Sequence, residues 1–116
     1  MEGWAEGYPL ALGLTLLIEV PVYAAGLATL CGVRRLPAIA AGAAVNLVSH
    51  PISFLVALPL LQPHIGYWPA LALIEVLVWP AEALMLLAWL RRDLPALLAL
   101  SFVANGLSLG IGLLIP

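Results

Sequence analysis

Long apolar stretches separated by short polar breaks dominate the chain. Four such stretches run over about residues 9–33, 36–61, 67–90 and 94–115, and each is longer than the ~20 residues that a helix needs to cross a bilayer. The breaks are only a few residues long, so consecutive helices must be antiparallel neighbours. The pattern predicts an all-α integral membrane protein, a four-helix transmembrane bundle that forms a single domain over residues 1–116.

The composition points to the lipid bilayer as the main partner and argues against a soluble fold. Of the 116 residues, 65% are hydrophobic and only 9% are charged, which leaves too few polar side chains to cover a surface in water. The first ten residues are acidic and lack the basic start of a secretory signal, so we expect the first apolar stretch to be retained. No basic patch is present, and nucleic-acid binding is therefore not expected.

The arginines predict how the bundle is oriented. Arg34 and Arg35 lie between the first two stretches, Arg91 and Arg92 lie between the last two, and the chain has no other Arg or Lys. Because positive residues concentrate in cytoplasmic loops, we expect both arginine loops in the cytoplasm and both termini outside, in the inner membrane of a prokaryotic cell. Aromatic residues expected at the outer interface are Trp4, Tyr8, Tyr67 and Trp68.

The two halves of the chain resemble each other. LLIEVPVYAA at 16–25 matches ALIEVLVWPA at 72–81, and an arginine pair, an LPA and either NLVS or NGLS follow each copy. Glu19 matches Glu75 and Asn46 matches Asn105, with an offset that drifts from 56 to 59 residues and so requires gaps. We interpret the match as two tandem-duplicated helical hairpins, at about 9–61 and 67–115, related by a twofold axis along the membrane normal.

Each predicted helix carries one polar stripe. Glu19 and Glu75 lie about 22 and 24 Å of helix from the arginines that follow them, which places both near the middle of the membrane. Charged side chains in hydrocarbon turn toward the bundle interior, so Glu19 and Glu75 are predicted to face each other across the axis. Asn46 and Asn105 should lie beside them. The stripes supply further polar groups in supporting positions: Ser49, Ser108, Tyr23 and Trp79.

Three glutamates lie inside the predicted membrane helices: Glu19, Glu75 and Glu82. Helix packing needs none of them, and each costs about 2.5 kcal/mol or more at the membrane centre when ionised, so we interpret them as functional. Burial favours the neutral form of a carboxyl group, which makes proton carriage chemically available. His50 and Glu82 break the repeat, because the matching positions in the other half are Leu109 and Gly26. This asymmetry indicates a particular task acquired after the duplication.

These residues support three hypotheses of function. The leading one is a membrane-embedded cation or proton binding protein, a small transporter or permease component, in which the matched glutamates bind while the asparagines and His50 orient them. An alternative is a bilayer-embedded metalloenzyme acting on a lipid-like substrate, with a divalent metal on ligands of suitable type: Glu19, His50, Glu75 and Glu82. No familiar catalytic motif accompanies them, so enzyme chemistry is not indicated.

The third hypothesis is a structural subunit of a larger membrane complex.

Gly106 and Gly110 form a GxxxG spacing in the last apolar stretch. Small residues at this spacing let two helices approach closely. The pattern is compatible with a close contact inside the bundle or with a homodimer.

The order of these motifs resembles that of a group of small four-helix membrane proteins that recur among prokaryotes and have no established function. The shared features are IEVPVY, NLVSHP at 46–51, and a second IEV with Glu82 seven residues after its glutamate. This resemblance covers most of the chain and implies a site formed by Glu19, Asn46, His50, Glu75 and Glu82. TLLIEV is also similar to the first helix of small multidrug resistance transporters, but the other motifs of that family are absent and the internal duplication is foreign to it.

Overall fold

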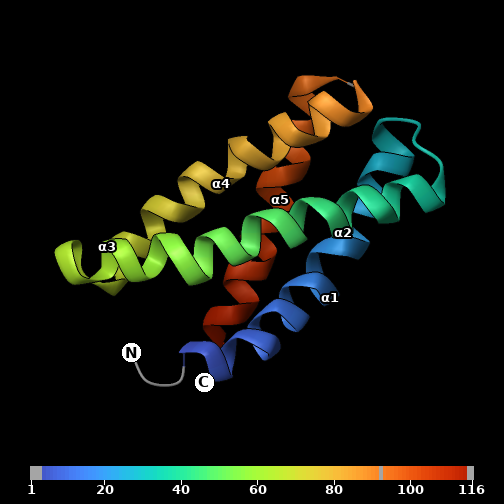
Figure 1. Cartoon of the computed structure of the whole chain (residues 1–116). Coiled ribbons are helices and arrows are strands. Elements are labelled where there is room, and N and C mark those ends of the chain that lie inside the picture. Colours follow the sequence, from blue (N-terminus) through green and yellow to red (C-terminus); the bar gives the residue numbers. More distant parts are fainter. Residues whose placement is uncertain (1–3, 92, 115–116) are drawn as a thin grey trace.

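The structure is a computed structural model that describes the backbone of residues 4–91 and 93–114 and, within these ranges, the side chains from residue 9 onward. Its elements are α1 (Trp4–Leu30), α2 (Arg35–Pro51), the π-helical η1 (Ile52–Ala57), α3 (Leu58–Ile65), α4 (Tyr67–Leu90) and α5 (Leu94–Leu114). Because α2, η1 and α3 follow one another without a break, they form a single span, and the described chain has four spans in all. The predicted all-α four-helix membrane bundle is thereby confirmed (Figure 1).

The span boundaries follow the predicted ones closely, with one difference at the beginning. α1 begins at Trp4, before the predicted start at about residue 9, so Pro9 lies inside the helix. Gly32 after α1 and Gly66 before α4 adopt φ angles of 67° and 87°, which glycine reaches without steric cost. Arg91 takes the same role after α4 with a φ of 54°. These three turns reverse the chain between consecutive spans.

The four spans pack in a ring. α1 contacts α2 and α5, while α4 contacts α5 on one side and α2, η1 and α3 on the other. In the described chain the backbones of α1 and α4 do not approach each other, nor do those of α2 and α5, so these pairs are diagonally opposite. A twofold axis between the α1–α2 and α4–α5 hairpins is compatible with this placement. The duplication itself stays a prediction.

The second span passes through a π-helical turn between two prolines. Pro51 and Pro59 have no N–H group, so neither can make the usual helical bond to the residue four positions earlier. In this segment the Leu58 N–H instead bonds to the Ser53 carbonyl, five residues earlier. Turns of this kind are frequent at functional sites. In this bundle the turn places Ser53 and Phe54 beside His50 on the inner face of the span.

The two ends of the bundle are packed differently. The loops that carry Arg34 and Arg91 lie at one end, the arginine end, and the turn at Gly66 lies at the other, the Gly66 end (Figure 1). Below the arginine loops, buried apolar side chains form the main core: Tyr23, Leu27, Val33, Ala38, Ala41, Val45, Ala83, Leu86, Leu97, Leu100 and Ala104. Toward the Gly66 end only a small cluster joins α3 to α4: Leu58, Ala70 and Ile74. The arginine end is therefore closed by apolar packing.

The outer surface of the described bundle is apolar. Leu17, Val76 and Phe102 come from three different helices, and each side chain is at least 60% exposed. Apolar surface of this extent requires lipid around it. Tyr67 and Trp68 are exposed at the start of α4 with their ring centroids 4.9 Å apart, where an interfacial belt was predicted. The side chains of Trp4 and Tyr8 lie outside the described residues.

Candidate functional site

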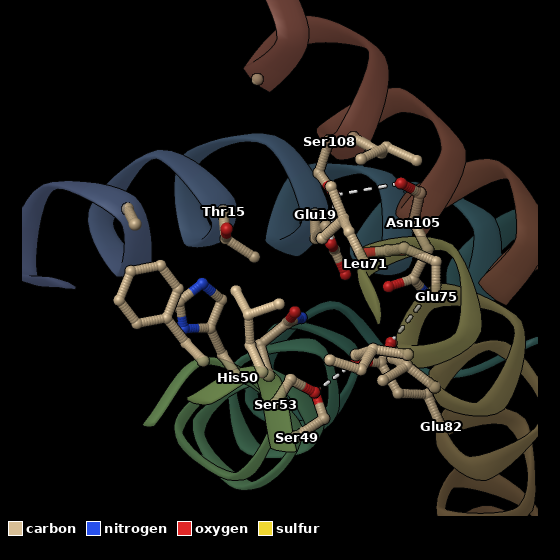
Figure 2. Close-up of a pocket in the computed structure, with 18 of the residues that line it drawn as sticks. Thr15, Glu19, Ser49, His50, Ser53, Leu71, Glu75, Glu82, Asn105 and Ser108 are labelled. Carbon is tan, nitrogen blue, oxygen red and sulfur yellow. Dashed lines mark hydrogen bonds between the residues drawn. The ribbon is translucent and has the colours of Figure 1, made fainter. Parts of the chain in front are cut away.

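A cavity of about 230 Å³ lies between the spans in the half of the bundle toward the Gly66 end. All four spans line it, and Figure 2 shows polar side chains from each of them turned toward a common space. Its deepest lining includes Glu82 and Asn105, and its outermost lining includes Ala11, Tyr67 and Leu113, close to the helix ends. The cavity thus runs from the middle of the bundle to its Gly66 end.

Glu82 is the carboxyl group that joins all four spans. Its side chain is 1% exposed. Oε1 accepts hydrogen bonds from the Tyr23 hydroxyl of α1 at 2.5 Å and from the Asn105 amide of α5 at 3.0 Å. Oε2 accepts one from the Ser49 hydroxyl of α2 at 2.5 Å. Both oxygens are therefore satisfied by donors that come from every other span.

Glu19 of α1 lies near the midpoint of its span and is 2% exposed. The Ser108 hydroxyl of α5 donates to Oε2 at 2.5 Å. Oε1 is buried and accepts no hydrogen bond within the described part of the chain. The Asn46 amide lies beside this carboxyl, but it donates to the Gly42 carbonyl at 2.8 Å. One oxygen of Glu19 is thus left without a donor in the cavity wall.

Glu75 lines the same cavity but is less deeply buried than the other two glutamates. It makes no side-chain hydrogen bond with another described residue. It lies close enough to both Glu19 and Glu82 for the three carboxyl groups to interact electrostatically. Glu19 and Glu75 therefore line the same cavity. Asn105, expected beside Glu19 and Glu75, lines the same cavity and donates to Glu82.

The remaining predicted residues fall into two groups. His50 lines the cavity, and its ring stacks on that of Phe54 with centroids 5.7 Å apart. Trp79 is not part of the cavity lining: its indole N–H donates to the Leu98 carbonyl at 2.7 Å, which attaches α4 to α5. Tyr23 is also not part of the cavity lining, and its hydroxyl donates a hydrogen bond to Glu82. Trp79 and Tyr23 are therefore helix-joining groups.

The cavity does not assemble the proposed metal ligands. Glu19, His50, Glu75 and Glu82 all line it, yet among the described residues no group of three or more His, Cys, Asp or Glu side chains is placed to hold a metal ion. A structural or catalytic zinc ion needs at least three convergent protein ligands. The geometry gives the metalloenzyme hypothesis no support.

Sequence reasoning missed the apolar part of the lining. Phe54, Leu71 and Leu109 line the cavity together with the polar groups. Phe54 lies four residues after His50, and this spacing could have identified it as a residue on the same helical face. No comparable signal marks Leu71 or Leu109.

Comparisons with known protein families, with curated proteins and with solved structures find no match to this chain. A four-helix bundle by itself hosts many unrelated activities. The function must therefore be argued from the chemistry of the cavity.

Proposed function

We propose that the chain is a membrane-embedded cation or proton binding protein that works as a small transporter or permease component. The observation that carries this proposal is the convergence of three carboxyl groups, Glu19, Glu75 and Glu82, on one cavity between apolar spans. Ionisable groups at this depth are costly and in membrane proteins mark ion pathways or proton relays.

The residues that line the cavity indicate the sign of the charge on the ligand. None of the described residues around the cavity is Arg or Lys, so no fixed positive charge balances the carboxyl groups. A bound cation or proton lowers the repulsion between them, whereas an anion increases it. The cavity therefore selects positive charge.

We further propose the inner membrane of a prokaryote as the location, with the arginine end in the cytoplasm. Fusions at the C-terminus test this orientation: a reporter active only outside the cytoplasm should be active, and one active only inside should be silent. A fusion placed instead in the loop before α2 should give the opposite pattern. Activity of the cytoplasmic reporter at the C-terminus would show that the orientation is wrong.

Uptake by proteoliposomes tests the activity itself. We expect the purified protein to admit protons or small cations well above the level of protein-free liposomes. Glu19→Gln should abolish most of this uptake, because glutamine keeps the size of the side chain but cannot bind a proton or balance a cation. Thr29→Ala, an exposed position whose hydroxyl bonds only within α1, serves as the matched control. Uptake by the parent protein at the protein-free level would refute the proposal.

A further inference from the structure

The cavity wall changes in character along every span. Toward the Gly66 end the lining residues become apolar: on α1 they change from Glu19 to Ala11, and on α5 from Asn105 to Leu113. The other two spans show the same change from polar to apolar lining. The inner part therefore offers carboxyl, amide and hydroxyl groups, while the outer part is mostly aliphatic and aromatic. A bare cation or a proton uses only the inner part. The apolar outer part indicates a ligand that has an apolar portion of its own.

One oxygen of the Glu19 carboxyl group, Oε1, has no hydrogen-bond donor in the described part of the protein, and a ligand in the cavity can supply one. This oxygen is buried without a donor among the described residues, although the side chain is only 2% exposed and lines the cavity (Figure 2). A buried acceptor left unpaired is unfavourable. Glu82 does not offer an equivalent position, because protein donors already occupy both of its oxygens. The ligand's donor therefore belongs at Glu19.

The size of the cavity limits the ligand. A volume of about 230 Å³ corresponds to that of about seven or eight water molecules at ~30 Å³ each. This is room for a positively charged group together with one ring or a short alkyl chain. The stacked rings of His50 and Phe54 line the cavity, and a ring of the ligand can pack against them.

We propose that the ligand is a small organic ammonium ion, whose N–H group donates to Glu19 Oε1 and whose apolar tail lies against Phe54, Leu71 and Leu109. This inference rests on the proposed function and specifies its substrate class. The ammonium supplies both the positive charge that the carboxyl groups select and the donor that Oε1 lacks. The tail fills the outer part of the cavity, which an inorganic ion leaves unused.

Equilibrium binding to the detergent-solubilised protein tests the inference with benzylammonium as the probe. We expect binding at one site per chain. Benzyl alcohol, a neutral analogue of similar shape, and methylammonium, which lacks the ring, should each bind about tenfold more weakly or worse, because each loses one of the two classes of contact. Phe54→Ala should weaken the binding of benzylammonium but leave the binding of methylammonium unchanged. Glu19→Gln should weaken the binding of both ammonium ions, and Thr29→Ala should change the binding of neither.

The outcomes separate this inference from the proposed function. Equal binding of benzylammonium and benzyl alcohol would overturn the inference, since the charge would then play no part. Absence of benzylammonium binding in a protein that still takes up protons or inorganic cations would overturn the inference and leave the proposed function standing. Absence of both activities would overturn both. The comparison of probes uses the unmodified protein, so it remains decisive if Glu19→Gln fails to fold.

Discussion

Replacing Glu82 by alanine should lower the free energy of unfolding by about 2–4 kcal/mol. Tyr23, Ser49 and Asn105 each donate to this carboxyl, and hydrogen bonds between membrane helices contribute about 0.6 kcal/mol each. The void left by the side chain adds a cost that grows with its volume. Reversible unfolding in mixed micelles measures the change. The effect is large because one side chain attaches α4 to all three other spans.

The matched control for this change is Glu75→Ala. Glu75 lies on the same helix and lines the same cavity, but makes no side-chain hydrogen bond with another described residue. We expect it to change the unfolding free energy by less than about 0.5 kcal/mol. Glu82→Gln should fall between the two, since it keeps the volume and one acceptor oxygen. If Glu75→Ala and Glu82→Ala were equally destabilising, Glu82 would not be the side chain that joins the four spans.

Gly42→Leu should destabilise the bundle by about 1–3 kcal/mol through overpacking between α1 and α2. A Cβ atom at Gly42 would lie 2.9 Å from the Cβ of Tyr23 and 3.6 Å from the Val20 backbone. The helices must therefore separate, and the Tyr23 hydroxyl moves away from Glu82. The same unfolding assay measures the loss. In the Gly42→Leu background, Tyr23→Phe should then lower the free energy of unfolding by little more, because the hydrogen bond from Tyr23 to Glu82 is already weakened.

Gly106→Leu is the control for steric crowding. A Cβ at Gly106 meets no described atom within 4 Å, and glycine inside a helix is about 1 kcal/mol less favourable than alanine. We therefore expect this change to be neutral or mildly stabilising. Within the described bundle the Gly106–Gly110 spacing is not used for a close contact, so a strongly destabilised Gly106→Leu would indicate a second chain packed on that face.

The spans could be predicted from sequence because the thickness of the bilayer determines their length. The third was predicted at 67–90 and is observed at Tyr67–Leu90. The π-helical turn at Ile52–Ala57 could not be predicted in the same way. Prolines at 51 and 59 indicated that backbone bonds were missing in this span, but several local rearrangements can compensate for a missing bond.

The central position of Glu82 could not be read from the repeat. The match between halves directed attention to Glu19 and Glu75, whereas Glu82 corresponds to Gly26, where an added Cβ would overlap the Leu100 side chain. Helical spacing puts Glu75 and Glu82 on one face. This spacing does not predict at which depth the four helices converge. Glu82 lies two helical turns nearer the arginine end than Glu75 does, where side chains of the neighbouring spans are close enough to donate hydrogen bonds to it.

The apolar part of the cavity could not be predicted because hydrophobic side chains carry no signal that separates a cavity wall from a lipid-facing surface. Leu71 lines the cavity, while Leu73 and Val76 on the same helix are exposed on the outside. In a soluble protein the outer face of a helix is polar and marks the helix orientation. In a membrane both faces are apolar, so the orientation depends on the few polar residues alone.

The apolar packing at the arginine end determines where the transmembrane voltage falls. Moving one elementary charge through the full membrane potential changes its energy by about 2.3 kcal/mol per 100 mV. When solvent fills the cavity from the Gly66 end, most of this potential drops across the apolar layer beneath the arginine loops. A cation that reaches Glu19 from the Gly66 end therefore crosses little of the voltage. Under the proposed function, passage beyond the layer that contains Leu27, Leu86 and Leu97 crosses nearly all of it, so the voltage acts on this second step and leaves the first almost unaffected.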